Sequence, residues 1–336
     1  MHPFRIQPDL RPRVWGGTRL TPAGSTRIGE AWLAGPSSQV VGGAGRGATL
    51  EQLAALHGAR LTGSDATAAG RFPLLAKILD PADWVSVQVH PNDEQARRLE
   101  GPDAVGKTEA WYVIEAAPDA EVLLGVQPSV RPEGVRQALR DGGLAGLLRR
   151  FRVAAGEAYL VPAGTLHAIG PGVLAYEIQQ PSDITYRCDD WGRPPSAGRP
   201  LHIEQALACL RPTPWAERIR SSTGSDPRGL LIDCEHFVVE YLRPGPEDAV
   251  PCDPGMASVH VLTAVTGSAV VCGAGWEERL DRFETLVVPA DAGSYQVAVP
   301  SEAPSSPMAS VVLLARLPAP GGRSTDAHEV AHVDLA

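Results

Sequence analysis

Short runs of apolar and β-branched residues, separated by glycine- and proline-rich turns, dominate the chain. Such runs occur at 72–80, 84–91, 108–116, 121–126, 157–162, 174–180 and 183–188, and again throughout 230–316. Short strands at regular spacing, with turn signals between them, are typical of β-sandwiches and barrels. Because segments 152–190 and 259–300 follow a similar plan, the pattern predicts an all-β-dominated fold with two related β-units.

Helical periodicity is confined to a few segments, namely 49–61, 93–101, 129–151 and 201–210. Thr49 precedes the first of them and is a candidate N-cap. In 129–151 the helical spacing occurs twice and is broken at Gly142–Gly143. This segment therefore predicts a pair of helices inserted between strands.

Composition narrows the classes of partner. The chain has 336 residues, 43% of them hydrophobic, which is enough for a sizeable core and for two domains or one large domain with an appendage. The formal net charge of −9 argues against nucleic acid as a partner. The five cysteines form no CxxC pair, and no signal peptide or long apolar run is visible. We therefore expect reduced thiols and a cytoplasmic protein that does not bind membranes, as a monomer or homodimer.

The strongest local motif is GEAYLVPAGTLH (156–167), which has the pattern G-x5-P-x-G-x2-H. It predicts a strand that ends at Pro162, a tight turn at Ala163–Gly164, and a histidine, His167, that opens the next strand toward the interior. This spacing is similar to the second motif of the cupin superfamily. The alternative is that His167 is an ordinary packed histidine of a strand.

Two further segments place polar residues on one face of a strand. In SVQVHP (86–91), Ser86, Gln88 and His90 share a face because side chains alternate along a strand. In GKTEAW (106–111), Lys107 and Glu109 share a face by the same rule. A solvent-facing row and an ordinary ion pair are the alternatives.

Taken together, these motifs supply two imidazoles, one carboxylate and one amide, from His90, His167, Glu109 and Gln88. Such a set suits a divalent ion such as zinc and leaves room for water or a substrate. Cobalt, manganese or iron could bind the same donors.

A wider set of segments resembles one family. The segments are RVWGG (13–17), IGEAW (28–32), FPLLAKILD (72–80), SVQVHP (86–91), GKTEAWYVI (106–114), PAGTLHAIGPGVLAYEIQQPSDITYR (162–187), DWGR (190–193) and LHIEQAL (201–207). They are similar to the type I mannose-6-phosphate isomerases in their short bacterial form, which belong to the cupin superfamily. The likeness runs in order from about residue 10 to 316.

The resemblance implies two cupin (jelly-roll) units. We expect a catalytic, metal-binding domain over 1–200 with a helical insertion at about 129–151. A second domain over 201–316 and a flexible tail over 317–336 would follow. In the second unit, the segment RFETLVVPADAGSYQV (282–297) has the turn but no following histidine. We therefore expect this unit to be structural and without a metal.

The resemblance also implies the reversible conversion of mannose 6-phosphate to fructose 6-phosphate, with one zinc ion per chain. The residues that match the family's metal ligands are Gln88, His90, Glu109 and His167. Lys107, Glu177 and Arg187 match catalytic residues, and Ser86 matches a serine beside the substrate, which Lys107 and Arg187 would also contact. Glu177 could instead pair locally, and Arg187 could be a surface arginine.

The expected chemistry is proton transfer through an enediol, for which Glu177 is the candidate group. A ligand histidine or a metal-bound water could serve instead. Cys188 and Asp189 depart from the family pattern, and we expect them to alter the rim of the substrate site. The rival interpretations are another cupin metalloenzyme, such as an oxygenase, and a non-catalytic sugar-phosphate-binding relative.

Overall fold

The computed structural model describes residues 1–21, 26–66, 70–194, 199–211, 217–220, 226–301 and 309–319. Most of the tail that we expected to be flexible, from residue 320 onward, lies outside these described residues.

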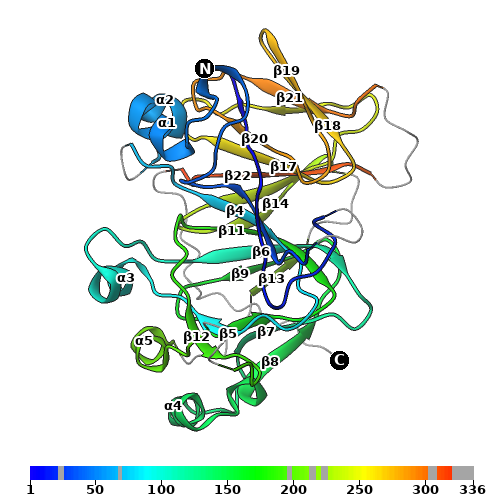
Figure 1. Cartoon of the computed structure of the whole chain (residues 1–336). Helices are drawn as coiled ribbons and strands as arrows, with labels where there is room; N and C mark the ends of the chain where they lie inside the picture. Colours follow the sequence, from blue (N-terminus) through cyan, green and yellow to red (C-terminus); the bar gives the residue numbers. More distant parts are fainter. Residues whose placement is uncertain are drawn as a thin grey trace.

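Antiparallel β-sheets are stacked as four layers in the described part of the chain (Figure 1). The first layer contains β12 (Tyr186–Asp189), β5 (Val87–Val89), β10 (His167–Ile169), β7 (Glu121–Val126) and β8 (Leu148–Arg152). The second contains β13 (Glu217–Arg220), β9 (Glu157–Val161), β6 (Glu109–Ala116), β11 (Val173–Gln179), β4 (Leu75–Leu79), β3 (Glu30–Ala34) and β2 (Asp9–Arg11).

The third and fourth layers form the second β-unit. The third contains β1 (Phe4–Arg5), β20 (Thr285–Val288), β17 (His260–Thr266), β22 (Val311–Arg316), β15 (Val238–Leu242) and β14 (Arg228–Asp233). The fourth contains β16 (Val250–Cys252), β21 (Tyr295–Ala298), β18 (Ala269–Gly273) and β19 (Trp276–Leu280). The predicted all-β-dominated fold with two β-units is confirmed.

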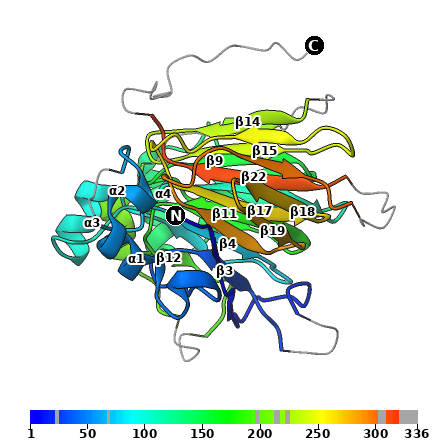
Figure 2. The ribbon, with the colours of Figure 1, turned by 90° about the horizontal axis from the view of Figure 1, so that it is seen from above.

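The helices lie on one side of this stack (Figure 2). They are α1 (Leu50–His57), α2 (Ala59–Thr62), α3 (Asp93–Glu100), α4 (Pro132–Asp141) and α5 (Ile203–Cys209), with 3-10 turns at η1 (Gly43–Gly45) and η2 (Leu144–Leu147). Thr49 caps α1 as predicted, because its side chain accepts a hydrogen bond from the backbone N–H of Gln52.

The pair of helices predicted over 129–151 is wrong in its second half. Helix α4 ends before Gly142, and only the 3-10 turn η2 follows it. Strand β8 then pairs with β7, with Phe151 opposite Val122. The helix-like spacing of leucines in 144–148 is satisfied by one short turn, and β-pairing to a neighbouring strand determines the rest.

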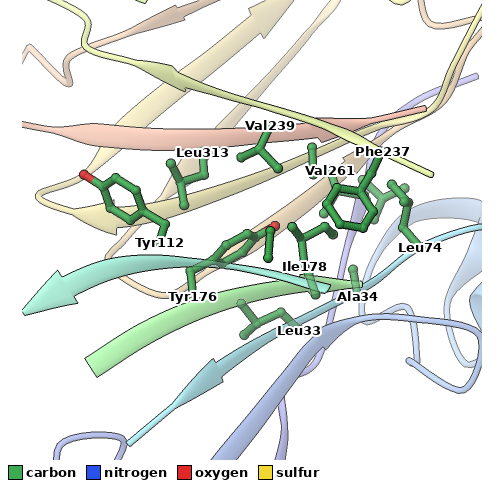
Figure 3. Packing of buried hydrophobic residues seen from close by; sticks show 14 of the residues in the cluster. Leu33, Ala34, Leu74, Tyr112, Tyr176, Ile178, Phe237, Val239, Val261 and Leu313 are labelled. Atoms are coloured by element: carbon green, nitrogen blue, oxygen red, sulfur yellow. The ribbon is translucent and has the colours of Figure 1, made fainter. Parts of the chain in front are cut away.

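Three apolar cores hold the layers together. Trp111 and Tyr159 contribute to the core between the first two layers, and Leu262 and Val271 to the core between the last two. The third core joins the two units. On the side of the first unit its members include Leu33, Tyr176 and Ile178. On the side of the second unit they include Phe237, Val261 and Leu313 (Figure 3). Burial of this apolar surface fixes the two units against each other.

Two short strands pair with the sheet of the other unit. Phe4 of β1 lies opposite Val287 of β20, and Glu217 of β13 lies opposite Leu160 of β9. The chain therefore crosses between the units at both places. The domain boundaries expected from the sequence, at about residues 200 and 316, stay a prediction.

None of the helices in the described ranges is both long and apolar enough to span a bilayer.

Replacing Phe237 by alanine should destabilise the protein strongly. Its side chain is fully buried in the core that joins the units, and loss of such a phenylalanine typically costs about 3–5 kcal/mol. Denaturant unfolding followed by tryptophan fluorescence measures the change. The matched control is Leu230→Ala, because Leu230 is 54% exposed and should change stability by only about 0.5 kcal/mol. Equal losses in both variants would contradict the packing described here.

Candidate metal centre and active site

Strand β5 presents different environments on its two faces. Val87 and Val89 are fully buried in an apolar cluster below the first sheet. Ser86 and Gln88 instead line a cavity, and His90 continues on their side of the strand into a buried polar cluster. The structure therefore has the alternation that the sequence predicts for this segment.

The G-x5-P-x-G-x2-H segment forms a strand, a tight turn and a second strand. Gly164 in the turn has φ +86°, and a Cβ there would lie 2.8 Å from Arg211 Cγ. Both the positive φ and the close approach require glycine. The turn places His167 at the start of β10, where it is 1% exposed and faces the interior as predicted.

The ligand atoms of His90, Glu109 and His167 lie within 4.8 Å of one another, and all three side chains are buried. Glu109 Oε2 is 3.2 Å from His90 Nε2, and Glu109 Oε1 is 3.3 Å from His167 Nε2. Over the ranges that the structure describes, this is the one group of three or more such donors close enough to hold an ion.

The hydrogen bonds at Nδ1 of both histidines fix the tautomer in which each ring faces Glu109. His90 Nδ1 lies 2.9 Å from the carbonyl oxygen of Ile184, and His167 Nδ1 lies 2.9 Å from that of Thr165. A carbonyl oxygen only accepts, so each Nδ1 carries the hydrogen and each Nε2 presents a lone pair.

Burial keeps these imidazoles neutral. It lowers the pKa of His90 to about 3 and lowers the pKa of His167 as well. Two neutral nitrogen lone pairs therefore face a carboxylate, and a cation between them would relieve their mutual repulsion. Two imidazoles held through Nδ1 and one carboxylate fit a divalent metal ion.

The amide of Gln88 lies at the edge of this cluster. Its Nε2 is 3.1 Å from His167 Nε2, and rotation of the amide by half a turn would present its oxygen instead. Gln88 can therefore serve as a fourth ligand of a metal ion through its amide oxygen.

Lys107 is a buried cation beside the same cluster. Its Nζ donates to Glu109 Oε2 at 2.5 Å and lies 3.1 Å from His90 Nε2. Burial by itself would lower the pKa of Lys107, but Glu109 and Glu177 raise it above its ordinary range. In turn, Lys107 outweighs the effect of burial on Glu109 and holds the pKa of that carboxyl well below its usual value.

A cavity of about 340 Å³ adjoins the cluster. Of the predicted site residues, Ser86, Gln88, Lys107, Glu177 and Arg187 line it. Gln88 and Lys107 contact the His90–Glu109–His167 cluster directly. The structure thus brings together every site residue that the sequence singled out.

Glu177 lies on β11 in the wall of this cavity and is 3% exposed. Its Oε1 lies 3.3 Å from Lys77 Nζ, and its Oε2 accepts a hydrogen bond from Trp111 Nε1 at 3.2 Å. Burial, followed by the negative charge of Glu109, raises the pKa of Glu177. A carboxyl group held so that its pKa is raised is suited to proton transfer.

Arg187 extends from β12 to the open side of the cavity. Its Nη1 donates to the carbonyl oxygen of Pro200, whereas its buried Nε has no hydrogen-bond partner in the part of the chain that the structure describes. Burial and the neighbouring Arg199 lower the pKa of Arg187. The guanidinium group therefore has an unused donor beside the cavity.

Sequence reasoning missed two residues of the site. Lys77 is buried in the cavity wall and pairs with Glu177, and Trp111 Nε1 bridges Glu109 and Glu177. A charged lysine within the apolar run 72–80 was a usable signal for Lys77. Trp111 gave none, because a tryptophan in an apolar strand is most often a core residue.

The expected effect of Cys188 on the substrate rim is not supported by its position. Cys188 is buried in the apolar cluster on the other face of β12 from Arg187. Asp189 accepts a hydrogen bond from the backbone N–H of Trp191 and does not line the cavity.

Comparison with known proteins agrees with this geometry. The family model described as phosphomannose isomerase type I, catalytic domain, matches residues 4–111. Mannose-6-phosphate isomerase ManA of Bacillus subtilis is 40% identical over 254 residues, which cover 70% of this chain and 78% of the relative.

Solved structures extend the likeness to almost the whole chain. The mannose 6-phosphate isomerase structure from Bacillus subtilis has a TM-score of 0.80 at 29% identity, covering 94% of this chain and 99% of that one. A structure described as holo, zinc-bound mannose 6-phosphate isomerase shares the fold, with a TM-score of 0.69 at 16% identity, covering 94% and 99% of the two chains. The chain therefore belongs to the type I mannose-6-phosphate isomerase (phosphomannose isomerase) family.

Proposed function

We propose that the chain is a metal-dependent aldose–ketose isomerase that interconverts mannose 6-phosphate and fructose 6-phosphate. The observation that carries this proposal is the buried His90–Glu109–His167 cluster, which adjoins a cavity lined by Lys107 and Glu177. Family membership supplies the substrate class. The cytoplasmic location and the monomeric or homodimeric state expected from the sequence are part of the proposal.

We infer that one zinc ion per chain is held by Gln88, His90, Glu109 and His167. Nitrogen and carboxylate donors suit zinc, and the zinc-bound relative has the same fold. A divalent ion bound there would supply positive charge next to the sugar oxygens. The Nδ1 hydrogen bonds of both histidines would hold the rings in place for this ion.

The reaction moves a proton between two neighbouring carbon atoms of the sugar. In the forward direction a base removes the proton from carbon 2 of the open-chain aldose, and the resulting enediol receives a proton at carbon 1 while the hydroxyl proton of oxygen 2 is transferred to oxygen 1. Glu177 would carry this proton, because burial and the negative charge of Glu109 raise its pKa and so make the carboxylate a stronger base. Lys77 and Trp111 would position its two oxygens.

Cationic side chains would stabilise the negative charge of the substrate and of the enediolate. Lys107 lies deep in the site and stays protonated, so it would stabilise the developing oxyanion. Arg187 lines the cavity, so its guanidinium group would bind the phosphate group. Ser86 lines the cavity beside Gln88 and would donate a hydrogen bond to a sugar oxygen.

Removing the metal should abolish turnover, and restoring zinc should recover it. The measurement is a coupled assay for fructose 6-phosphate formed from mannose 6-phosphate, run on chelated protein before and after zinc is added. A folded, metal-loaded protein with no turnover on any divalent ion would contradict the isomerase proposal and favour a non-catalytic binding protein. Consumption of oxygen would favour another cupin metalloenzyme.

Replacing Glu177 by glutamine should lower kcat by about 10²–10⁴-fold with little change in KM, because an amide cannot transfer the proton. The matched control is Glu133→Gln, whose side chain is 81% exposed in α4 and should leave kcat unchanged. Undiminished turnover of the Glu177 variant would remove this residue from the mechanism.

Replacing Arg187 by alanine should raise KM for mannose 6-phosphate by about 10–100-fold, the loss expected for a hydrogen bond between charged groups. Steady-state kinetics of the purified variant test this expectation. Arg150→Ala is the control, because Arg150 is half exposed and pairs with Glu121 on the far side of the first sheet. An unchanged KM in the Arg187 variant would show that the phosphate is bound elsewhere.

A further inference from the structure

The second β-unit has a cavity of its own, with a volume of about 610 Å³. The residues that matter here, from strands β14, β16 and β21 and their ends, are Arg228, Cys252, Asp253, Ser294, Tyr295 and Gln296. A cavity of this size with several convergent polar groups is typical of a small-molecule site.

Two lining residues of this cavity, Cys252 and Tyr295, match positions of the metal cluster in the strand register of the first unit. In the first unit, His167 opens β10 and lies opposite Gln88 of β5. In the second unit, Tyr295 opens β21 and lies opposite Cys252 of β16. Tyr295 and Cys252 therefore occupy the positions of a candidate metal-ligating histidine and amide.

A third position corresponds in the larger sheet of each unit. Glu109 opens β6, which pairs with the strand that leads into the turn before His167. His260 opens β17, which pairs with the strand that leads into the turn before Tyr295. The carboxylate of the first unit is thus replaced by an imidazole.

His260 and Tyr295 form a buried polar pair, of which Tyr295 also lines the cavity. Tyr295 Oη lies 2.7 Å from His260 Nδ1, and each of these residues is only 3% exposed. Apolar side chains would fill a purely structural barrel at lower cost, because buried polar groups lose their hydration. The second unit instead keeps this hydrogen-bonded polar pair in its interior, next to the cavity that Tyr295 lines.

The walls of the cavity carry balanced charge. Arg228 contributes a guanidinium group, which pairs with Glu240 at 2.8 Å, and Glu240 also contacts Arg316 at 3.4 Å. Asp253 contributes a carboxylate, whose Oδ2 accepts a hydrogen bond from Ser294 at 2.8 Å. One cationic and one anionic group on the lining favour a ligand without net charge.

An aromatic surface adjoins these polar groups. The ring of Trp276 lies 6.1 Å from that of Tyr295, between ring centroids. Gly273 lines the cavity, and a Cβ there would lie 2.2 Å from an atom of the Trp276 ring. The absence of a side chain at this position therefore makes room for the ring. Aromatic carbon beside paired donors and acceptors matches the alternating apolar and hydroxyl faces of a polyol.

We propose that this second cavity binds an uncharged, polyhydroxylated small molecule, of the class of a free hexose, separately from the catalytic cavity. The proposal rests on the side chains of the second β-unit and does not depend on the isomerase reaction.

The test is a titration of the full, metal-loaded chain with D-mannose, D-glucose and D-fructose in turn, followed by saturation-transfer NMR. Concentrations extend to about 50 mM, where a ligand of millimolar Kd saturates its site. The cavity variant is Asp253→Ala together with Gln296→Ala, and Gln296→Trp is a second variant that fills the cavity. Arg187→Ala is the matched control in the catalytic cavity.

We expect at least one hexose to bind the unmodified chain and the Arg187 variant alike. Both cavity variants should weaken this binding about tenfold or more, with kcat and the unfolding midpoint unchanged. The proposal is overturned if no hexose binds, if the cavity variants bind as well as the unmodified chain, or if only Arg187→Ala abolishes binding. Displacement of the hexose by inorganic phosphate would make this an anion site and would also overturn it.

Discussion

A single buried carboxylate, Glu109, organises the catalytic end of the molecule. Two neutral imidazole nitrogens face its oxygens, and a lysine ammonium donates to it from the side. In water these electrostatic interactions would be weak. The surrounding sheets exclude solvent, so each charge interacts more strongly with its neighbours. The walls of the barrel are therefore part of the site. Packing of the apolar residues of β5 and β6 fixes the positions of His90 and Glu109 along their strands. The backbone carbonyls of Ile184 and Thr165 orient the rings of the two histidines.

Sequence patterns predicted this centre well because strands alternate with a period of two. Gln88 and His90 share a face in the structure because Val87 and Val89 must face the apolar cluster. The turn before His167 was predictable for a second reason, since the positive φ of Gly164 restricts which residue can stand there. Patterns confined to a few neighbouring residues carry this kind of information reliably.

Contacts between distant strands could not be predicted in this way. The pairing of Lys77 with Glu177 depends on β4 lying next to β11, which no local pattern specifies. Residues 148–152 form a strand because they pair with the edge of β7, although the spacing of their apolar residues favours a helix. The His260–Tyr295 pair has no sequence motif of its own, because a tyrosine stands where the motif has its histidine.

The pairing of β1 with β20 has a consequence for how the chain is made. Phe4 leaves the ribosome about 280 residues before its partner Val287. At about 5–20 residues per second, that interval lasts tens of seconds. During this interval the edge of β1 has no partner strand, and the apolar face of the second layer, which later packs against β17 and β22, is uncovered. The nascent chain must therefore avoid misplaced β-pairing until the strands of the second unit have been made. The first strand of the chain therefore completes its pairing only after the second unit has been synthesised.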